Sequence, residues 1–330
     1  LLIMKVLYIG SAQGFGNADR FYLIPQKLIN GFVRARHNVY VFNDRDYARA
    51  SNIFGSRKFG VGKMNAKALE IVRDFRPDLV VLGHCESLHN DTLEDMRAIN
   101  PDIKIVYRNV DPLSDAGNAE DIENRAGIVD GIFITTAGDV IRQFEKGRTL
   151  VRHMPNPIDP SIETGRAFEG EAPTDVFFAG RFLRHAGADH REATLRHLLD
   201  TLPDARFDIY GGGMNDRLLF GHEYIAKVSQ AKIGLCLNKT YDYYLYASDR
   251  IAQYLGNGLL VAIHKDTGFG DVFAEDEMIL FESDDDLAEK VKWYLANDDA
   301  RRQAARKSWE KAHRIYNCQK VAEDIINAVF

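Results

Sequence analysis

Polar residues follow several short apolar runs in this sequence, at the positions where buried strands would end. His84 and Glu86 come directly after the run 78–83, and Asp111 follows the run 103–109. An imidazole or a carboxylate at the end of a strand can accept a proton from an incoming hydroxyl group. We therefore expect a general base among these three residues, with Asp111 preferred and His84 and Glu86 as the alternatives.

A glycine-rich loop, 10–16, follows the first apolar run, 4–10. Its glycines let backbone amides come close to a phosphate or a sugar, although a plain connecting loop would have the same composition. The spacing departs from G-x-G-x-x-G, and no G-x-x-x-x-G-K-[ST] occurs, which disfavours a classical dinucleotide or P-loop enzyme. The candidates for substrate contact in this half of the chain are Gly14, Phe15, Gly16 and Asn109.

Arginines and glycines take the corresponding positions in the second half of the chain. Arg181 follows the run 175–180, and its planar guanidinium suits the oxygens of a diphosphate. Arg250 lies in the first turn of a short predicted helix, where a cation opposes the helix dipole unless an anion is bound. Ser248 is the expected N-cap of that helix, and Gln253 lies one turn further on, within reach of ribose hydroxyls. The predicted binding residues are Gly180, Arg181, Tyr210, Gly211, Gly212, Asn238, Lys239, Ser248, Arg250 and Gln253.

The apolar runs that must position these residues alternate with segments of helical spacing. Runs rich in Val and Ile indicate strands buried on both faces, and about five occur in the first half. Strands separated by helices predict an α/β protein with parallel, doubly wound sheets. Pro155, Pro157 and Pro160 then interrupt the pattern and predict a hinge. We expect two Rossmann-like lobes facing a cleft, with domains at 1–155 and 156–312 and a helical segment, 313–330, that returns to the first lobe.

Composition excludes several classes of protein. The chain has 330 residues, 42 of them basic and 48 acidic, so its formal net charge is −6. A net acidic chain is a poor general binder of nucleic acid. Its three widely spaced cysteines offer neither a disulfide framework nor a Cys-x-x-Cys metal site. The sequence Asp44-Arg45-Asp46 has the spacing of a metal-binding pair, but we interpret it as a polar turn and expect no metal and no cofactor.

The sequence also bears on location. No run of about 18 apolar residues occurs, so no membrane-spanning helix is expected. Residues 1–3 precede Met4 and are too short for a signal peptide, which favours a cytoplasmic protein. Basic residues recur near the C-terminus, and we interpret them as a solvated helix face, with contact to an anionic membrane surface as the alternative. They are Arg301, Arg302, Arg306, Lys307 and Lys311.

The stretch from Ser248 to Gly258, followed by Val272-Phe273 and the tail from Glu282, resembles a known family. It is similar to the glycosyltransferases related to the spore-maturation protein CgeB, within the group 1 enzymes of the GT-B fold. The similarity covers about residues 175–320, and the first lobe agrees in architecture alone. It implies a nucleotide-sugar donor in the second lobe, an acceptor in the first, and no metal requirement. Arg181 and Arg250 would then stabilise the diphosphate leaving group, and Gln253 stands where relatives carry a Glu that holds the ribose.

The resemblance therefore implies a glycosyltransferase that moves a sugar from a nucleotide sugar to a hydroxyl group. The implied acceptor is a glycan or a lipid-linked or protein-linked molecule, in the assembly of surface polysaccharide or glycoconjugate. Two alternatives remain open. One is a nucleotide-sugar 2-epimerase of the same fold, and the other is a two-lobe binding protein for a small molecule. Incubation with the donor alone distinguishes the epimerase, because only that enzyme converts a nucleotide sugar without an acceptor.

Overall fold

The computed structural model describes residues 2–12, 18–181, 189–211, 214–215 and 217–330. Its contacts divide the chain into two compact units: unit 1 contains Leu1–Pro157 and Cys318–Phe330, and unit 2 contains Ile158–Asn317. The first boundary thus falls in the proline-rich segment that predicted a hinge. Unit 1 is assembled from two separate stretches of chain, since the final helix belongs to it.

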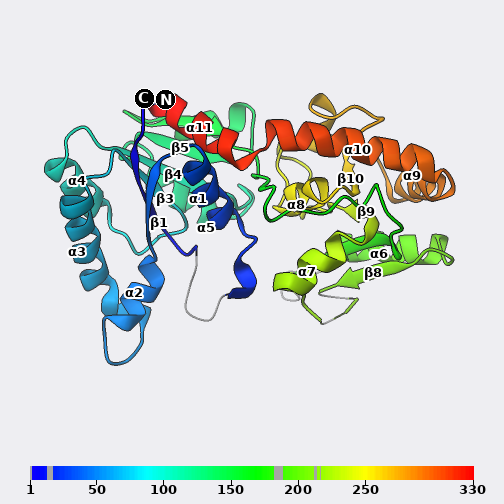
Figure 1. Cartoon of the computed structure of the whole chain (residues 1–330), viewed down its shortest axis with the longest axis horizontal. Helices are drawn as coiled ribbons and strands as arrows, with labels where there is room; N and C mark the ends of the chain where they lie inside the picture. Colours follow the sequence, from blue (N-terminus) through cyan, green and yellow to red (C-terminus); the bar gives the residue numbers. More distant parts are fainter. Residues whose placement is uncertain (1, 13–17, 182–188, 212–213, 216) are drawn as a thin grey trace. The chain divides into compact units, whose positions relative to one another are not determined.

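Unit 1 contains a six-stranded parallel sheet with the strand order β2-β1-β3-β4-β5-β6. The strands and their connections are visible in Figure 1. The strands are β1 (Lys5–Ile9), β2 (Asn38–Phe42), β3 (Leu79–Leu82), β4 (Lys104–Asn109), β5 (Gly131–Ile134) and β6 (Leu150–His153).

Helices connect these strands. Because parallel crossovers are right-handed, α1 lies on one face of the sheet and α3 and α4 lie on the other (Figure 1). The final helix, α11, packs against α1. The helices of unit 1 are α1 (Ile24–Arg34), α2 (Asp44–Ala50), α3 (Arg57–Phe75), α4 (Asn90–Ile99), α5 (Ala116–Glu123) and α11 (Cys318–Val329), with 3-10 turns at Ala18–Arg20 and Asp139–Phe144.

Unit 2 contains a five-stranded parallel sheet with the order β11-β10-β9-β7-β8. Its strands are β7 (Thr174–Ala179), β8 (Phe207–Tyr210), β9 (Ala231–Leu235), β10 (Leu260–His264) and β11 (Ile279–Phe281). Its helices are α6 (His190–Thr201), α7 (Gly221–Val228), α8 (Arg250–Gly256), α9 (Asp284–Ala296) and α10 (Asp298–Ile315), with 3-10 turns at Lys265–Thr267 and Phe269–Asp271. The prediction of two parallel, doubly wound α/β sheets is confirmed.

Each sheet has its own apolar core. All four residues of β3 are buried, as expected for a central parallel strand that is covered by helices on both faces. Val81 and Phe32 belong to the core of unit 1, whereas Val176 and Leu235 belong to that of unit 2. The three cysteines, Cys85, Cys236 and Cys318, are buried and form no disulfide bond, in agreement with the absence of a disulfide framework in the sequence.

The structure corrects two sequence-based expectations in unit 1. The segment Asp44-Arg45-Asp46, expected to be a polar turn, begins helix α2, and the Asn43 side chain caps that helix by accepting a hydrogen bond from the Asp46 amide. A sixth strand, β6, forms the edge of the sheet, where about five strands were expected. It escaped prediction because Val151 is its one buried residue.

Candidate functional site

The carboxyl ends of β3 and β4 bring three sequence-predicted residues of unit 1 together. His84 Nε2 lies 3.7 Å from Asp111 Oδ2, and His84 Nδ1 lies 3.8 Å from Glu86 Oε1. The strands are hydrogen-bonded neighbours, so the loops that follow them meet at one edge of the sheet. All three side chains are at least partly exposed. An imidazole flanked by two carboxylates can take up a proton and be stabilised as the cation.

The surroundings of His84 favour its neutral form. Burial lowers the pKa of His84, and the Arg108 guanidinium lowers it further, against the opposite effects of Asp111 and Glu86. Burial raises the pKa of Glu86, but a hydrogen bond from its own amide and the Arg45 guanidinium outweigh this, so that the pKa of Glu86 is lowered. At neutral pH the group therefore combines a neutral imidazole, which can act as a base, with an ionised carboxylate.

Two arginines that the sequence analysis did not select act on this group, Arg45 by direct contact and Arg108 through its charge. Arg45 Nη2 donates to both carboxylate oxygens of Glu86, at 3.0 and 3.2 Å, and to the His84 carbonyl at 3.1 Å. Arg108 is 2% exposed, and its Nε and Nη2 donate to the Tyr8 hydroxyl at 3.2 and 3.1 Å. Sequence spacing offers no signal for either contact, because the partners are 41 and 100 residues apart.

Asn109, predicted to contact a substrate, is fully buried. Asn118 Nδ2 donates to Asn109 Oδ1 at 3.2 Å and to the Asp111 carbonyl at 2.9 Å. The pair of amides thus holds the loop that carries Asp111, and Asn109 positions this loop rather than lining the surface. The predicted contacts Gly14, Phe15 and Gly16 lie outside the described residues.

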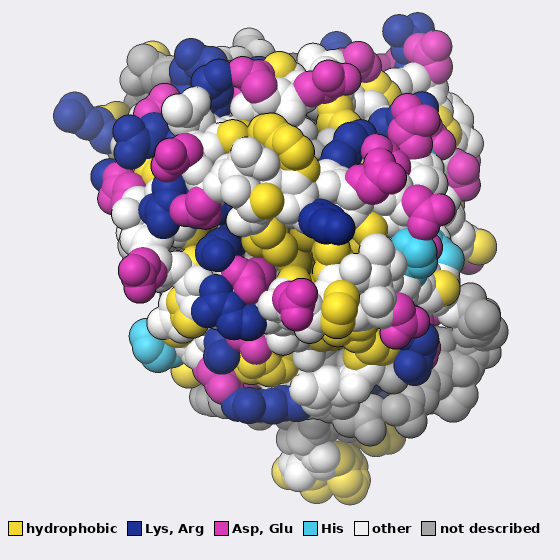
Figure 2. All heavy atoms as spheres, turned by 90° about the vertical axis from the view of Figure 1, so that its right-hand side faces the viewer, with side chains coloured by type: hydrophobic (Ala, Val, Ile, Leu, Met, Phe, Trp, Pro, Cys, Tyr) yellow, Lys and Arg dark blue, Asp and Glu magenta, His cyan; other side chains and the backbone are white. Residues whose placement is uncertain are grey.

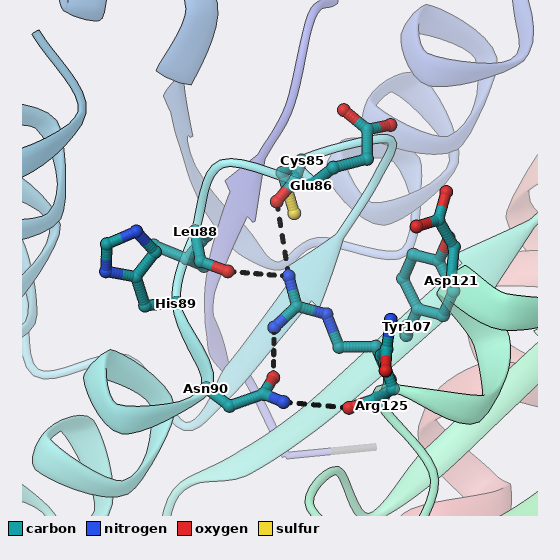
Figure 3. A pocket seen from close by; sticks show the side chains of 9 residues that line it. Cys85, Glu86, Leu88, His89, Asn90, Tyr107, Asp121 and Arg125 are labelled. Atoms are coloured by element: carbon teal, nitrogen blue, oxygen red, sulfur yellow. Dashed lines mark hydrogen bonds between the residues drawn. The ribbon is translucent and has the colours of Figure 1, made fainter. Parts of the chain in front are cut away.

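A pocket of about 260 Å³, lined in part by polar side chains, lies beside Glu86 in unit 1. Figure 3 shows the Arg125 guanidinium at its centre, directed toward Leu88 and Asn90. Arg125 Nη2 donates to the carbonyls of Leu88, at 2.7 Å, and Cys85, at 3.3 Å, while Nη1 donates to Asn90 Oδ1. Its charge is therefore used to hold the loop. The lining residues are Cys85, Glu86, Leu88, His89, Asn90, Tyr107, Asp121, Asn124 and Arg125.

The chemistry of this pocket is polar rather than nucleophilic. Burial raises the pKa of the Cys85 thiol to about 12, so Cys85 stays protonated and unreactive. Burial and the charge of Glu86 raise the pKa of Asp121. Carboxylate and amide groups in an open pocket suit the hydroxyl groups of a carbohydrate, since they can accept and donate hydrogen bonds.

In unit 2, Arg250 joins the ends of two strands. Its Nη2 donates to the Leu237 carbonyl at 2.6 Å, its Nη1 donates to the Ala179 carbonyl at 3.3 Å, and the guanidinium lies 5.3 Å from the centre of the Phe178 ring. Gly180 lies directly beside it, since a Cβ built on Gly180 would be 3.1 Å from Arg250 Nη1. The residue is thus part of the frame that holds these strand ends.

Close backbone approach explains a second glycine in this region. Gly211 has a φ of 101°, and a Cβ there would lie 1.8 Å from the Gly180 carbonyl oxygen. A glycine is required because the ends of β7 and β8 meet at this point. Tyr210, just before it, is buried, and Gly212 lies outside the described residues.

Of the remaining predicted residues of unit 2, Gln253 and Asn238 are buried, whereas Arg181 and Lys239 are exposed. Gln253 is 2% exposed, and its amide accepts a hydrogen bond from the Tyr224 hydroxyl and donates to Asp249 at 2.9 Å, so it is engaged inside the unit. Asn238 is buried and donates to the Tyr246 carbonyl. Arg181 and Lys239, in contrast, are exposed at the strand ends.

Ser248 is not the N-cap of α8. Asp249 occupies that position, without a side-chain capping bond. The Ser248 hydroxyl is buried, and it has no hydrogen-bond partner among the described residues. The error arose because serine is a frequent N-cap, whereas helix α8 here begins one residue later.

Neither a metal-binding cluster nor a membrane-spanning helix is found in the parts of the chain that the structure describes. No group of three or more His, Cys, Asp and Glu side chains there is arranged to hold a metal ion. No helix among these residues is long and apolar enough to cross a membrane.

Comparisons with known proteins place this geometry in context. Residues 189–327 match a family model described as glycosyl transferase-like. No curated protein sequence matches the chain. OtsA is similar to it in structure, with a TM-score of 0.63, 11% identity and 99% of both chains covered. AviGT4, a glycosyltransferase involved in avilamycin A biosynthesis, has a TM-score of 0.59 and 12% identity over 99% of this chain and 97% of its own.

HepE from Anabaena, in complex with UDP-glucose, is a third similar structure. Its TM-score is 0.56, with 12% identity and 98% of both chains covered. The predicted GT-B fold and the resemblance to group 1 glycosyltransferases are confirmed by these matches.

Proposed function

We propose that this chain, a glycosyltransferase of the GT-B fold, transfers a sugar from a nucleotide sugar held by unit 2 to a hydroxyl group held by unit 1. The observation that carries the proposal is the grouping of His84, Glu86 and Asp111 at the strand ends of unit 1. The match to the glycosyl transferase-like family supports the assignment of the donor to unit 2, since it begins at residue 189.

The donor that we propose is a uridine diphosphate sugar, because HepE has been solved with UDP-glucose. Arg250, Arg181 and Lys239 supply positive charge at the strand ends of unit 2. An arginine has five N–H donors, and the two carbonyl contacts of Arg250 use two of them. Its Nε is buried, so the remaining N–H groups of Nη1 and Nη2 are the ones that can donate to a diphosphate and stabilise the charge that develops on it as it leaves. Cationic side chains then take the role of a divalent ion, so we propose a transfer that needs no metal.

In this scheme the acceptor proton passes to His84 rather than to Asp111, the base preferred from the sequence, because His84 lies between Asp111 and Glu86 and its lowered pKa keeps it neutral. The hydroxyl oxygen forms a bond to the anomeric carbon as the bond from that carbon to the diphosphate breaks, and the diphosphate leaves with the electron pair. His84 Nε2 takes the hydroxyl proton, and Asp111, 3.7 Å away, stabilises the resulting imidazolium. Arg45 fixes Glu86 on the other side of the ring. The pocket beside Glu86 is the proposed position of the acceptor, which we take to be a glycan in cytoplasmic assembly of surface polysaccharide or glycoconjugate.

The test measures UDP release from UDP-sugars in the presence of a panel of glycan acceptors. We expect His84→Gln to slow transfer by roughly 10²–10⁴-fold, with the affinity for UDP unchanged. Asp111→Asn keeps the shape of the side chain and removes its charge, so a smaller loss is expected. The control is His222→Gln, at an exposed position on α7.

Three outcomes would contradict the proposal. Transfer by His84→Gln within a few-fold of the wild-type rate would remove His84 as the base. Conversion of the nucleotide sugar to its epimer without any acceptor would identify an epimerase instead. Loss of turnover in a chelator, restored by Mg²⁺ or Mn²⁺, would show that a metal is required.

A further inference from the structure

The connection between α2 and α3, together with the first turn of α3, carries three strongly exposed apolar side chains, which we call the apolar tip. Ile53 is 94% exposed, Phe54 73% and Phe59 64%. The rings of Phe54 and Phe59 are paired, with their centres 5.5 Å apart. Figure 1 shows this connection as a loop that projects from the free end of the α2–α3 pair. Contiguous apolar side chains in such a position mark an interaction surface.

The apolar tip is held in place by polar contacts. Asn52 Nδ2 donates to the carbonyls of Ala48 and Ser56, both at 2.8 Å, and Asn52 Oδ1 accepts from the Ser56 amide at 3.2 Å. Lys63 Nζ donates to the Ser51 carbonyl at 2.9 Å. The exposure of Ile53 and Phe54 is therefore built into an ordered loop.

Basic residues surround the apolar tip. The segment 47–69 contains five lysines and arginines and no acidic residue, although acidic residues outnumber basic ones by 48 to 42 in the whole chain. Four of the five are exposed: Arg49, Arg57, Lys58 and Lys63. A basic collar around protruding Ile and Phe side chains is complementary to an anionic lipid surface, because the cations meet the headgroups while the apolar groups enter the layer below.

The basic residues of α10, considered in the sequence analysis as a membrane contact, are engaged elsewhere. Arg301 is fully buried and pairs with Asp298. Lys307 pairs with Asp276, and Lys311 pairs with Glu277 at 2.7 Å. On the face of the molecule seen in Figure 2, Lys and Arg side chains are interspersed with Asp and Glu. In the segment 47–69, Arg49 pairs with Asp46 and Lys67 with Glu70. The basic residues nearest the apolar tip, Arg57, Lys58 and Lys63, make no ion pair among the described residues and are exposed.

We propose that the apolar tip docks unit 1 on an anionic membrane surface, with Ile53 and Phe54 inserted among the lipids and Arg57 and Lys58 on the headgroups. The docking does not depend on the proposed reaction, since it involves neither the His84 group nor the donor residues.

The test is co-sedimentation of the whole chain with vesicles, either of phosphatidylcholine alone or of equal parts phosphatidylcholine and phosphatidylglycerol. We expect binding to the anionic vesicles and little to the neutral ones. The double substitution Ile53→Ser and Phe54→Ser should weaken binding by about tenfold or more. Reversal of charge by Arg57→Glu and Lys58→Glu should weaken it by a similar factor, and added salt should do so too.

The matched control replaces an exposed apolar residue of unit 2, Trp293→Ser, which is 52% exposed on α9. It should bind vesicles as the wild type does, and melting temperatures verify that each variant is folded. Equal binding by the wild type and the Ile53/Phe54 variant would overturn the proposal. So would an absence of vesicle binding, whether the chain stays monomeric or self-associates through the apolar tip in sedimentation velocity.

Discussion

At the scale of the single residue, Arg250 combines a structural role with a proposed role in donor binding. Its guanidinium donates to the carbonyl of the last residue of β7 and to a carbonyl just after β9, and the same group is the proposed contact for the donor diphosphate. From the sequence alone, an exposed cation in the first turn of a helix would contribute little to stability. The structure corrects this, because removal of the side chain leaves two carbonyls at the strand ends without their donor.

Arg250→Ala is therefore expected to lower both the free energy of unfolding and the affinity for UDP. The loss of stability should be about 1–3 kcal/mol, since each carbonyl loses a hydrogen bond from a charged donor. Chemical denaturation measures the first effect, and titration calorimetry of the folded variant measures the second. Arg181→Ala, at an exposed position, is the comparison and should lower affinity alone. Unchanged UDP affinity in folded Arg250→Ala would leave Arg250 with a structural role only.

In unit 1, Asp44 at the start of α2 has a buried carboxyl group. It is 1% exposed, its Oδ1 has no hydrogen-bond partner among the described residues, and burial raises the pKa of Asp44 to about 6. A folded-state pKa above the unfolded value means that the stabilisation is complete at low pH. It is lost as the pH rises from about 4 through 6, where the folded protein must ionise a buried group.

Asp44→Asn should therefore stabilise the protein above pH 6 and change little at pH 4. A shift of about two pKa units corresponds to roughly 3 kcal/mol, which sets the upper limit of the effect. The measurement is the difference in free energy of unfolding between variant and wild type at pH 4 and pH 8. Asp139→Asn, with a side chain 90% exposed, serves as the control. A difference that is the same at both pH values would refute the assignment of this pKa.

Sequence alone could predict part of the residue-level site. His84, Glu86 and Asp111 follow adjacent parallel strands, and the rule that such ends meet brought them together. Arg45 and Arg108 could not be found in this way, because their partners are distant in the chain and no local spacing encodes them. Gln253 was expected to reach a ligand, but a helix position does not reveal whether a side chain faces the core.

At the scale of elements, the α2–α3 pair depends on close contact at one glycine. A Cβ on Gly60 would lie 1.7 Å from the Ala48 carbonyl oxygen, whereas one on Gly62 would have no atom within 4 Å. Both residues belong to α3, so they share the same backbone geometry. The same helix thus contains one glycine that packing requires and one that it does not.

Gly60→Ala should destabilise the protein by about 1–3 kcal/mol, because α2 and α3 must move apart. Gly62→Ala should stabilise it by about 0.5–1 kcal/mol, since alanine favours the helical backbone. Thermal melts of the two variants provide the measurement. Equal shifts in the same direction would contradict the packing described here.

Element prediction failed where an element lacks a continuous apolar pattern. Helix α2 has seven residues and begins with the charged triplet Asp44-Arg45-Asp46, so its composition resembled a turn. Strand β6 has one fully buried residue and lacks the continuous apolar character of the central strands. The long apolar strands, in contrast, were predicted correctly because burial on both faces leaves a strong signal.

At the scale of the whole molecule, the chain leaves unit 1, forms unit 2 and returns. The return is fixed by α11, which packs against α1 so closely that a Cβ on Gly31 would lie 2.1 Å from the Cys318 carbonyl oxygen. Arg34 Nη1 also donates to Cys318 Sγ at 3.0 Å. Sequence patterns predicted two lobes, but the order of the strands follows from contacts between distant segments.

Gly31→Ala should therefore destabilise unit 1 alone. The expected loss is about 1–3 kcal/mol, as the added methyl group forces α1 and α11 apart. Hydrogen exchange should quicken at the amides of α1 and α11 and stay unchanged in α6 to α10. Val33→Ala, at an exposed position on the same helix, is the control. Faster exchange throughout unit 2 would show that the two units do not unfold separately.

The return of α11 also sets the order in which a ribosome can deliver a complete fold. The nascent chain makes the six strands of unit 1 first, but residues 318–330 emerge only after the whole of unit 2. At about 5–20 residues per second, synthesis of Ile158–Asn317 takes roughly 10–30 s. During that time the apolar face of α1 lacks its covering helix, so the unit begun first is the unit finished last.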